Sequence, residues 1–401
     1  MSPAAMSRRL AWTVRVVAIG FIFDLCLTPK LWLGVRAYAL TPVGPLPSIL
    51  PPWDSVAFVG LIAANALVLL MPTRRWPVML ALAWYLLYSL WDQQRWVPFF
   101  NEMAAFYLAF AFRRRRGTED DATSALATCA VVIAFIYVWS GLQKLNWVFF
   151  TESFPWMMAP FEPVVPAGVF RNLTHLGPGI ALLETSIGVM LLTARARRVG
   201  VVLGLLMHTF ILLSAGPLGN NGNTQVWSWN VAAGALLLLV FWHSSMPAAD
   251  VLDPRRGWVH VVALVFFAVM PIFNVVQIDH FKWDDFQAGT LYSGNEERGT
   301  IYFAEQDAGR VPEHLSDLVW RSEEDGRLFI RILDWAYADL NVPDYHADRI
   351  YLSVMRSFCR QIGPGGSFVL EIGSTANRWT GDRQITRYVC GPAGNVERLD
   401  G

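Results

Sequence analysis

The sequence predicts a mainly α-helical, polytopic membrane protein, with about nine transmembrane helices followed by a small extracytoplasmic α+β domain. Three observations support this. Of the 401 residues, 54% are apolar and only 16% are charged, whereas soluble domains typically carry about 25% charged residues. Apolar runs of spanning length recur up to residue 276. Residues 277–401 hold 13 basic and 20 acidic side chains. We therefore expect a helix bundle over 1–276 and an acidic domain over 277–401.

Each predicted helix rests on an apolar run, because crossing the hydrocarbon core takes about 20 residues. Nine runs qualify to within a few residues, the third and fourth being short and ending in polar groups: 10–28, 55–71, 77–91, 97–112, 124–143, 177–193, 199–216, 227–243 and 258–276. Arg15 and Asp24 interrupt the first run, and no small-residue cleavage site follows it. We interpret it as a retained helix rather than a cleaved signal peptide.

Arginine clusters predict the orientation. They fall in every second connection between the runs: Arg8/Arg9, Arg74/Arg75, Arg113 to Arg116, Arg195/Arg197/Arg198 and Arg255/Arg256. Cytoplasmic loops carry an excess of Lys and Arg, so we expect the N-terminus inside and the acidic domain outside. In a bacterium this means the inner membrane and the periplasm. Basic residues confined to short loops favour the bilayer as partner and speak against nucleic acid.

Polar side chains gather in the outer halves of the predicted helices. Such residues are costly inside a bilayer and usually mark a site. The candidates are Asp92 and Arg95 in an outer turn, with Asn101 and Glu102 a turn further in, then Gln143, Lys144, Asn146, Glu184, His208, Trp227 and Asn230 on later helices. We expect a polar cavity that opens toward the outside.

Each candidate has a structural alternative. Glu184 and His208 lie on consecutive antiparallel helices and could hydrogen-bond each other, holding that hairpin together. Asp92 and Arg95 could form a solvated ion pair in their turn. Trp227 could belong to an aromatic belt at the membrane interface.

Lys144 is harder to explain structurally. The chain contains 29 Arg but only three Lys, and a residue that merely anchors at the interface could equally be arginine. Burial can turn lysine into a neutral base, whereas arginine stays protonated. A functional lysine and an interfacial anchor are therefore both open interpretations.

Residues 137–150 read YVWSGLQKLNWVFF and are followed at 154–160 by FPWMMAP. This stretch resembles the motif of the vitamin K-dependent γ-carboxylase-like family, also called the horizontally transferred transmembrane (HTTM) domain. Glu184 and the Leu206-Met-His208 step are similar to an acidic and a histidine position of that family, so the likeness covers about 10–243. It implies a quinone or quinol cofactor, Lys144 as the base that deprotonates the quinol, and a substrate approaching from outside.

The chain also departs from that family. The large lumenal domains of true carboxylases have no counterpart of that size here, and their histidine-bearing turn reads WDQQRWVP at 91–98. The resemblance therefore implies quinone- or lipid-linked chemistry rather than glutamate carboxylation. The same outline is similar to redox-associated membrane proteins of the DoxX and MauE type, which support partner enzymes.

The acidic part shows the alternation of strands at 299–304, 327–332, 367–372 and 384–390, and helical spacing at 334–340 and 345–361. The preceding segment, 279–295, should pack on the bundle and could roof the cavity. Cys359 and Cys390 share this domain, where an oxidising compartment would permit a disulfide. Cys26 and Cys129 lie in predicted spans and should pack as small apolar residues.

The sequence lacks the motifs that are typical of several reaction classes. The sequence contains no Cys-x-x-Cys, His-Glu-x-x-His, Gly-x-Ser-x-Gly or phosphate-binding glycine loop. Metal, serine-hydrolase and nucleotide chemistry are therefore disfavoured, and no metal site is predicted.

Two functions fit these observations. The first is an enzyme with Lys144 as base, Glu184 and His208 positioning it, and Asp92 and Arg95 at the cavity mouth. The second is a non-catalytic membrane subunit whose acidic domain docks a periplasmic protein partner. A transporter is less favoured, because the sequence shows no paired broken helices in inverted halves.

Overall fold

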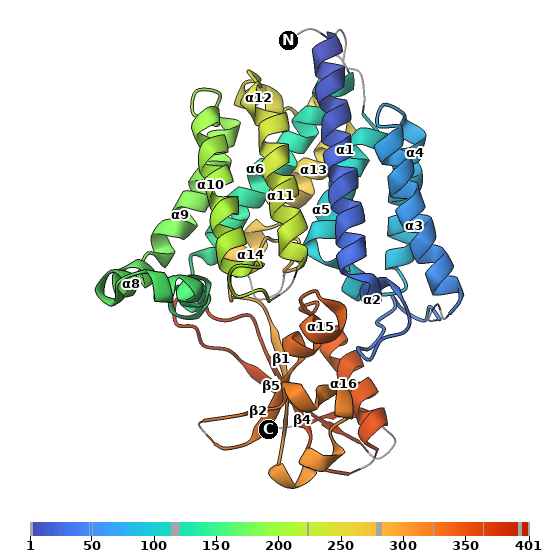
Figure 1. The fold of residues 1–401 in the computed structure, drawn as a ribbon, viewed down its shortest axis with the longest axis vertical. Helices are drawn as coiled ribbons and strands as arrows, with labels where there is room; N and C mark the ends of the chain where they lie inside the picture. Colours follow the sequence, from blue (N-terminus) through green and yellow to red (C-terminus); the bar gives the residue numbers. More distant parts are fainter. Residues whose placement is uncertain are drawn as a thin grey trace.

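The computed structural model describes residues 3–47, 49, 51–113, 121–222, 224–277, 283–323, 325–363, 365–391 and 395–399. It is mainly helical, with a long bundle and a small antiparallel sheet near the C-terminus (Figure 1). Arg114 to Arg116 of the predicted arginine clusters, and residues 279–282 of the predicted roof, lie outside the described residues.

The bundle runs from the N-terminus to residue 276. Its α-helices are α1 (Pro3–Leu27), α2 (Pro29–Trp32), α3 (Trp53–Leu70), α4 (Arg75–Ser89), α5 (Pro98–Ala111), α6 (Asp121–Lys144), α7 (Phe154–Met158), α8 (Ala167–Thr174), α9 (Gly177–Leu192), α10 (Arg197–Ala215), α11 (Gln225–Leu237), α12 (Ala248–Val251), α13 (Trp258–Ala263) and α14 (Ile272–Val276). Short 3-10 or π-helical turns join or extend them: η1 (Gln93–Trp96), η2 (Phe149–Ser153), η3 (Ala159–Val164), η4 (Leu238–Trp242), η5 (Pro254–Arg256) and η6 (Leu264–Val269).

Six described helices are long and apolar enough to cross a membrane: Ala4–Leu27, Trp53–Leu70, Asp121–Lys144, Arg197–Ala215, Gln225–Trp242 and Trp258–Val276. A seventh candidate is the pair α8 and α9, which is bent by 55°. The third and fourth predicted spans correspond to α4 and α5, which have only 15 and 14 residues. All nine predicted runs are helical, and the count of nine spans stays a prediction.

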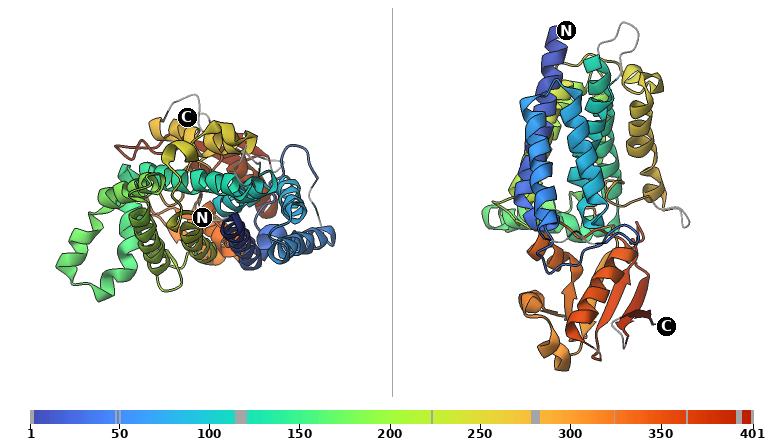
Figure 2. Two further views of the ribbon diagram at one scale, coloured as in Figure 1. Left: turned by 90° about the horizontal axis from the view of Figure 1, so that it is seen from above. Right: turned by 90° about the vertical axis from the view of Figure 1, so that its right-hand side faces the viewer.

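The two ends of the bundle differ in chemistry. Arginines from separate connections meet at one end, where Arg75 pairs with Asp121 at 2.5 Å and Arg197 donates to the Ser244 carbonyl at 2.9 Å. The C-terminal domain packs at the other end, away from the N-terminus (Figures 1 and 2). The arginine-bearing end and the C-terminal domain thus lie at opposite ends of the bundle, and the orientation in a membrane stays a prediction.

The C-terminal domain is the predicted α+β unit. Its elements are β1 (Arg298–Phe303), η7 (Glu305–Arg310), η8 (Glu313–Leu318), β2 (Trp320–Arg321), β3 (Leu328–Arg331), α15 (Ile332–Leu340), α16 (Asp348–Ile362), β4 (Val369–Gly373), β5 (Ile385–Cys390) and β6 (Val396–Arg398). The sheet order is β2-β3-β1-β4-β5-β6, and every neighbouring pair is antiparallel. On β1, Ile301 and Phe303 are buried and alternate with more accessible residues, as expected when one face packs on helices.

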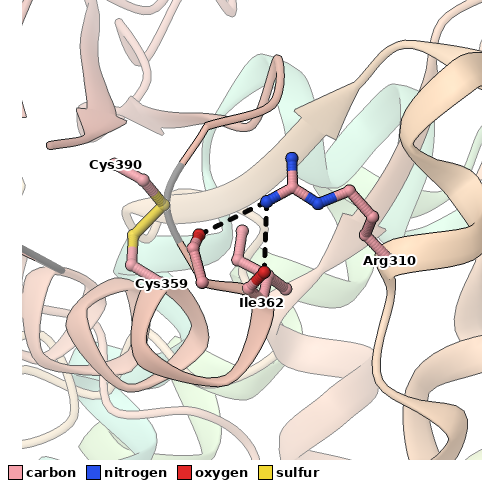
Figure 3. The surroundings of a disulfide bond; sticks show 5 residues. Arg310, Cys359, Ile362 and Cys390 are labelled. Carbon is pink, nitrogen blue, oxygen red and sulfur yellow. Dashed lines mark hydrogen bonds between the residues drawn. A yellow bond between two sulfur atoms is a disulfide. The ribbon is translucent and has the colours of Figure 1, made fainter. Parts of the chain in front are cut away.

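The predicted disulfide is confirmed. Cys359 on α16 is bonded to Cys390 at the end of β5, with 5.6 Å between their Cα atoms. Beside it, Arg310 donates to the carbonyl oxygens of Ile362 at 3.1 Å and Gly363 at 3.4 Å (Figure 3). The end of α16 is thus tied both to the sheet and to the loop that follows β1.

Buried polar contacts join the domain to the bundle. The Gln94 side chain donates to the Pro343 carbonyl at 2.6 Å and accepts from the Tyr345 amide at 3.0 Å. Arg378 donates to the Gln143 side-chain oxygen at 3.0 Å. Because these groups lose water on docking, each contact is expensive to leave unmade. The domain is therefore seated on the bundle in one specific orientation.

Breaking the disulfide should destabilise the C-terminal domain. The bridge closes a loop with a sequence separation of 31, and its loss through Cys359→Ser should reduce the free energy of unfolding by about 3 to 4 kcal/mol. Thermal unfolding of the purified full chain would measure this. Cys26→Ser is the control: Cys26 is exposed, contrary to the expectation that it packs inside, whereas Cys129 is buried as expected. Equal stability of Cys359→Ser and the parent chain would contradict this prediction.

Asp344 should make domain stability depend on pH. Burial raises the pKa of this carboxyl to about 7, with a smaller opposing effect from its hydrogen bond to Tyr351. The folded state then binds a proton more tightly than the unfolded state. The contribution of protonated Asp344 to the free energy of unfolding should be fully present below pH 4. It should then be lost as the pH rises from 4 to 7, which lowers the free energy of unfolding by about 4 kcal/mol. Unfolding measured between pH 4 and 8 should show this slope, and Asp344→Asn should remove it. An unchanged slope in that variant would count against the assignment.

Candidate functional site

A cavity lies in the half of the bundle nearest the C-terminal domain. Its volume is about 110 Å³, on a scale where one water needs roughly 10–15 Å³. The walls are mostly apolar and aromatic. The polar groups that line it are Glu102 on α5, Tyr137, Ser140 and Lys144 on α6, Glu184 on α9, His208 on α10 and Asn230 on α11. Residues from five helices thus converge on one cavity.

Lys144 and Glu184 form a buried ion pair in this cavity. The Lys144 Nζ lies 3.0 Å from one Glu184 carboxylate oxygen and 3.2 Å from the other. It also donates to the Ser140 hydroxyl, one turn earlier on α6, at 2.5 Å. The side chains of the pair are 9% and 8% exposed, so the ammonium is not a solvated interfacial anchor. Removing either partner would leave a buried charge alone.

Two glycines let α6 and α9 come close enough for this pair. A Cβ atom at Gly141 would lie 2.3 Å from the Thr185 hydroxyl and 2.6 Å from the Ala181 carbonyl oxygen. A Cβ atom at Gly188 would lie 2.5 Å from the carbonyl oxygen of Ala134. Small residues at a helix interface allow such close backbone approach within membranes. The small residue in the motif around Lys144 therefore has a direct packing role.

Tyr137, His208 and Asn230 form a second polar chain across three helices. The Asn230 amide nitrogen donates to the Val226 carbonyl at 2.7 Å, which turns its oxygen toward the His208 Nδ1 atom, also at 2.7 Å. This network assigns the His208 proton to Nδ1. In the neutral ring Nε2 is then an acceptor, and the Tyr137 hydroxyl lies 2.5 Å from it.

In the structure, Glu184 and His208 each bind other residues and do not bind each other. Glu184 binds Lys144, and His208 binds Tyr137 and Asn230. The alternative in which Glu184 and His208 hold their hairpin together by a mutual hydrogen bond is therefore wrong. The two residues nevertheless share the cavity, as the polar pattern of the sequence predicted.

Glu102, which the sequence placed with Asn101 a turn inside Asp92 and Arg95, is a further member of the site. It lines the main cavity and also a smaller neighbouring one, beside Trp139 and Phe286. Its Oε2 atom is buried without a hydrogen-bond partner among the described residues. A buried oxygen without a hydrogen bond is costly, so this atom is a candidate contact for a ligand or water. The sequence signal for this residue was that Glu102 is the only acidic residue in the apolar run at 97–112.

Gln143 and Asn146 lie beside the site but serve docking rather than the cavity. Gln143 accepts from Arg378 of the C-terminal domain. Asn146 donates to the Ser293 carbonyl at 3.0 Å and accepts from the Phe149 amide at 2.9 Å, which begins the next helical turn. Neither residue lines the cavity described above.

Asp92 and Arg95 also have structural roles, and neither lines that cavity. Asp92 is buried and pairs with Arg36 at 2.6 Å. Arg95 is buried too, with a guanidinium nitrogen donating to the Tyr88 carbonyl at 2.7 Å and its charge 4.0 Å from the centre of the Tyr88 ring. They are thus neither the cavity mouth nor a solvated ion pair, because Arg36 from the loop before α3 binds Asp92, whereas Arg95 donates to the Leu31 and Trp32 carbonyls of α2.

Trp229, and not the predicted Trp227, lines the cavity. The α11 residues that line the cavity include Val226, Trp229, Asn230 and Ala233, which share one helix face by their spacing. Trp227 lies on a different face. The two tryptophans are two positions apart, so the rotation of α11 about its axis decides which of them faces the cavity. Only packing sets that rotation.

The segment before the C-terminal domain roofs the cavity, as predicted. Phe286, Gly289, Leu291 and Tyr292 all line it. The domain holds this roof in place, since the Phe286 ring packs edge-on against Tyr345 with 5.4 Å between centroids. The C-terminal domain therefore contacts the element that closes the site.

Comparison with known proteins gives no relative: no family model, no curated protein and no solved structure matches this chain. Within the described part of the chain, no group of three or more His, Cys, Asp or Glu is placed to hold a metal ion. The resemblances stated above rest on sequence motifs, and what they imply about function stays a proposal.

Adding a side chain at the α6–α9 contact should disturb the site. Gly141→Ala places a methyl against backbone atoms of α9, and overpacking of this kind costs about 1–3 kcal/mol. We expect a lower thermal unfolding midpoint in detergent. Gly179→Ala, at the start of α9, is the matched control because a Cβ atom there meets nothing within 4 Å. Equal effects of the two substitutions would contradict the packing argument.

Proposed function

We propose that this protein is an integral membrane enzyme that binds a lipid-soluble, ring-bearing substrate, of the quinol class, and transfers a proton to or from it. The observation that carries the proposal is the convergence of a Lys144–Glu184 pair and a Tyr137–His208 hydrogen bond on one apolar-walled cavity. Ligand sites are typically apolar pockets with a few placed polar groups, and this cavity has that composition.

The residues present fit such a ring. Phe99, Trp229 and Phe286 supply aromatic walls, which favour a flat apolar ligand. The unpartnered Glu102 oxygen offers an acceptor for a ligand hydroxyl. A bound quinol would supply an acidic hydroxyl whose deprotonation makes it reactive, as the family resemblance implies.

The ion pair shapes the role of Lys144. Both Glu184 oxygens lie within 3.2 Å of the Lys144 Nζ atom, so Lys144 donates its hydrogen bonds to that carboxylate. It becomes a base only after its proton passes to Glu184, over the same short contact. Moving that proton leaves two neutral groups, so no unpaired charge is created in the apolar interior. Meanwhile the His208 Nε2 atom is placed to accept the Tyr137 proton.

We further propose that nine helices cross the membrane, with the arginine-bearing end in the cytoplasm and the C-terminal domain outside. Arginine clusters at one end support this through the positive-inside rule. The Cys359–Cys390 bond supports an oxidising compartment for the domain. In a bacterium, that is the inner membrane with the domain in the periplasm.

A non-catalytic subunit of the DoxX or MauE type is the second candidate. One observation favours it: β2 forms an edge of the sheet and its Trp320 is 50% exposed. Edge strands can pair with another chain, so a periplasmic partner could dock there.

Binding of a quinol analogue separates the two. The purified full chain in nanodiscs should bind a short-chain quinol, and Tyr137→Phe and Lys144→Met should each weaken binding or turnover by about tenfold, since each removes one polar contact of the cavity. Trp227→Phe is the control, because Trp227 does not line the cavity. Absent binding, or equal behaviour of all three variants, would overturn the enzyme proposal. Loss of cellular function on Trp320→Ser, with Lys144→Met silent, would favour the subunit.

A further inference from the structure

The loop between β4 and β5 of the C-terminal domain, residues 374–384, reaches the helix ends of the bundle. Arg378 in this β4–β5 loop is buried, and its guanidinium donates to the carbonyl oxygens of Leu142 at 2.8 Å and Leu145 at 3.1 Å. These carbonyls lie at the end of α6, which is one of the helices long and apolar enough to cross a membrane. Arg378 thus fixes the loop to the end of that candidate span.

The same loop is bonded to the end of a second candidate span. The Gln277 side chain donates to the Ala376 carbonyl at 2.7 Å and accepts from the Arg378 amide at 3.2 Å. Gln277 directly follows the candidate span Trp258–Val276. Two separate attachments therefore place residues 376–378 at the level where both apolar helices end. In a bilayer this level corresponds to the lipid headgroups, because the apolar length of a spanning helix matches the hydrocarbon core.

Two exposed tryptophans lie at this level. Trp379, the next residue of the loop, is 70% exposed, and Trp147, which follows α6, is 51% exposed. The Trp147 amide donates to the Arg378 carbonyl at 2.7 Å. The loop also backs onto the Trp147 ring, since a Cβ atom at Gly381 would lie 2.7 Å from the ring Cδ1 atom. Tryptophan is enriched at membrane–water interfaces, where its apolar ring and polar N–H group are both accommodated.

The loop holds Trp379 on an internally bonded turn. The Asn377 side-chain oxygen accepts from the amides of Trp379 at 3.0 Å and Thr380 at 3.2 Å. The Asn377 backbone accepts from the Gly381 amide at 2.9 Å and donates to the Asp382 carbonyl at 2.7 Å. A preorganised turn loses little conformational entropy when its side chain is bound. Trp379 is therefore presented in the manner of an anchor.

An exposed apolar surface leads along the second span to the loop. Only 28% of the most apolar stretch of Trp258–Val276 is buried inside the protein. A span this exposed faces lipid if it crosses a bilayer, and its exposed side continues to Gln277, where the loop is attached. Five apolar side chains along this surface are between 38% and 54% exposed: Val265, Phe266, Val269, Ile272 and Val276.

We infer that the β4–β5 loop inserts Trp379 into the headgroup region of the bilayer, so that the C-terminal domain contacts lipid as well as the bundle. The occupant of this surface is lipid, because the exposed apolar surface of the neighbouring span runs directly to the loop. The C-terminal domain is then held at a fixed height over the membrane. The inference depends on the bundle lying in a membrane and not on the chemistry proposed at Lys144.

The test compares two fluorescent labels on the purified full chain in phosphatidylcholine nanodiscs. Cys26→Ser removes the exposed free cysteine, whereas Cys129 is buried. In that background, Thr380→Cys carries an environment-sensitive nitrobenzoxadiazole label beside an intact Trp379. Gln306→Cys is the matched control. Both positions are exposed, but Gln306 lies in η7, beyond the end of β1, a strand of six residues that spans roughly 20 Å from the bundle side.

A lipid that carries a nitroxide near its headgroup quenches only labels at that depth. We expect it to quench the label at position 380 at least about threefold more than the label at position 306, because the loop lies among the headgroups. Iodide in the water should show the opposite preference. Equal quenching of the two labels by the nitroxide lipid overturns the inference.

A second measurement needs no substitution and decides the question should Thr380→Cys fail to fold. Hydroxyl-radical footprinting of the parent chain in nanodiscs, followed by mass spectrometry, compares the oxidation of Trp379 with that of Trp320. Trp379 is 70% exposed and Trp320 only 50% in the protein alone. Lipid cover should reverse this order and leave Trp379 oxidised at roughly half the rate of Trp320 or less. Faster oxidation of Trp379 than of Trp320 overturns the inference.

Discussion

The structure depends on one constraint: a polar side chain placed within an apolar helix bundle must find its partner inside the protein. Hydrocarbon offers no hydrogen bonds, so unpaired groups there are expensive. Lys144 and Glu184 meet this requirement by pairing across α6 and α9. Asp92 meets it through Arg36. The chain thus accommodates several ionisable side chains in an otherwise apolar core without leaving most of them unpaired.

The exceptions to this pairing are informative. The Glu102 Oε2 atom is one of the buried polar atoms without a hydrogen-bond partner in the part of the chain that the structure describes. Glu102 borders the cavity that also holds the Lys144–Glu184 pair. Because an unmet hydrogen bond is costly, such atoms are retained where something else supplies the partner. The proposed function uses this atom as an acceptor for a ligand hydroxyl.

The C-terminal domain connects these features to the outside of the bundle. Its contacts with Gln94 and Gln143 seat it over the cavity, and Tyr345 holds Phe286 of the roof. The roof and the domain therefore both border the cavity on this side. The same domain is stabilised internally by a disulfide.

Composition and pattern alone determined the helix bundle, the division near residue 276, the strands and helices of the acidic domain, the Cys359–Cys390 pair and the grouping of Lys144, Glu184, His208 and Asn230. These depend on local hydropathy and on which helix end each residue occupies, and both are readable along the chain. Tertiary packing decided the rest. The rotation of α11 places Trp229 rather than Trp227 at the cavity. Asp92 pairs with Arg36, which lies in the long loop after α2, and not with Arg95 in its own turn. Such choices turn on contacts between distant segments, whose energies no local pattern records.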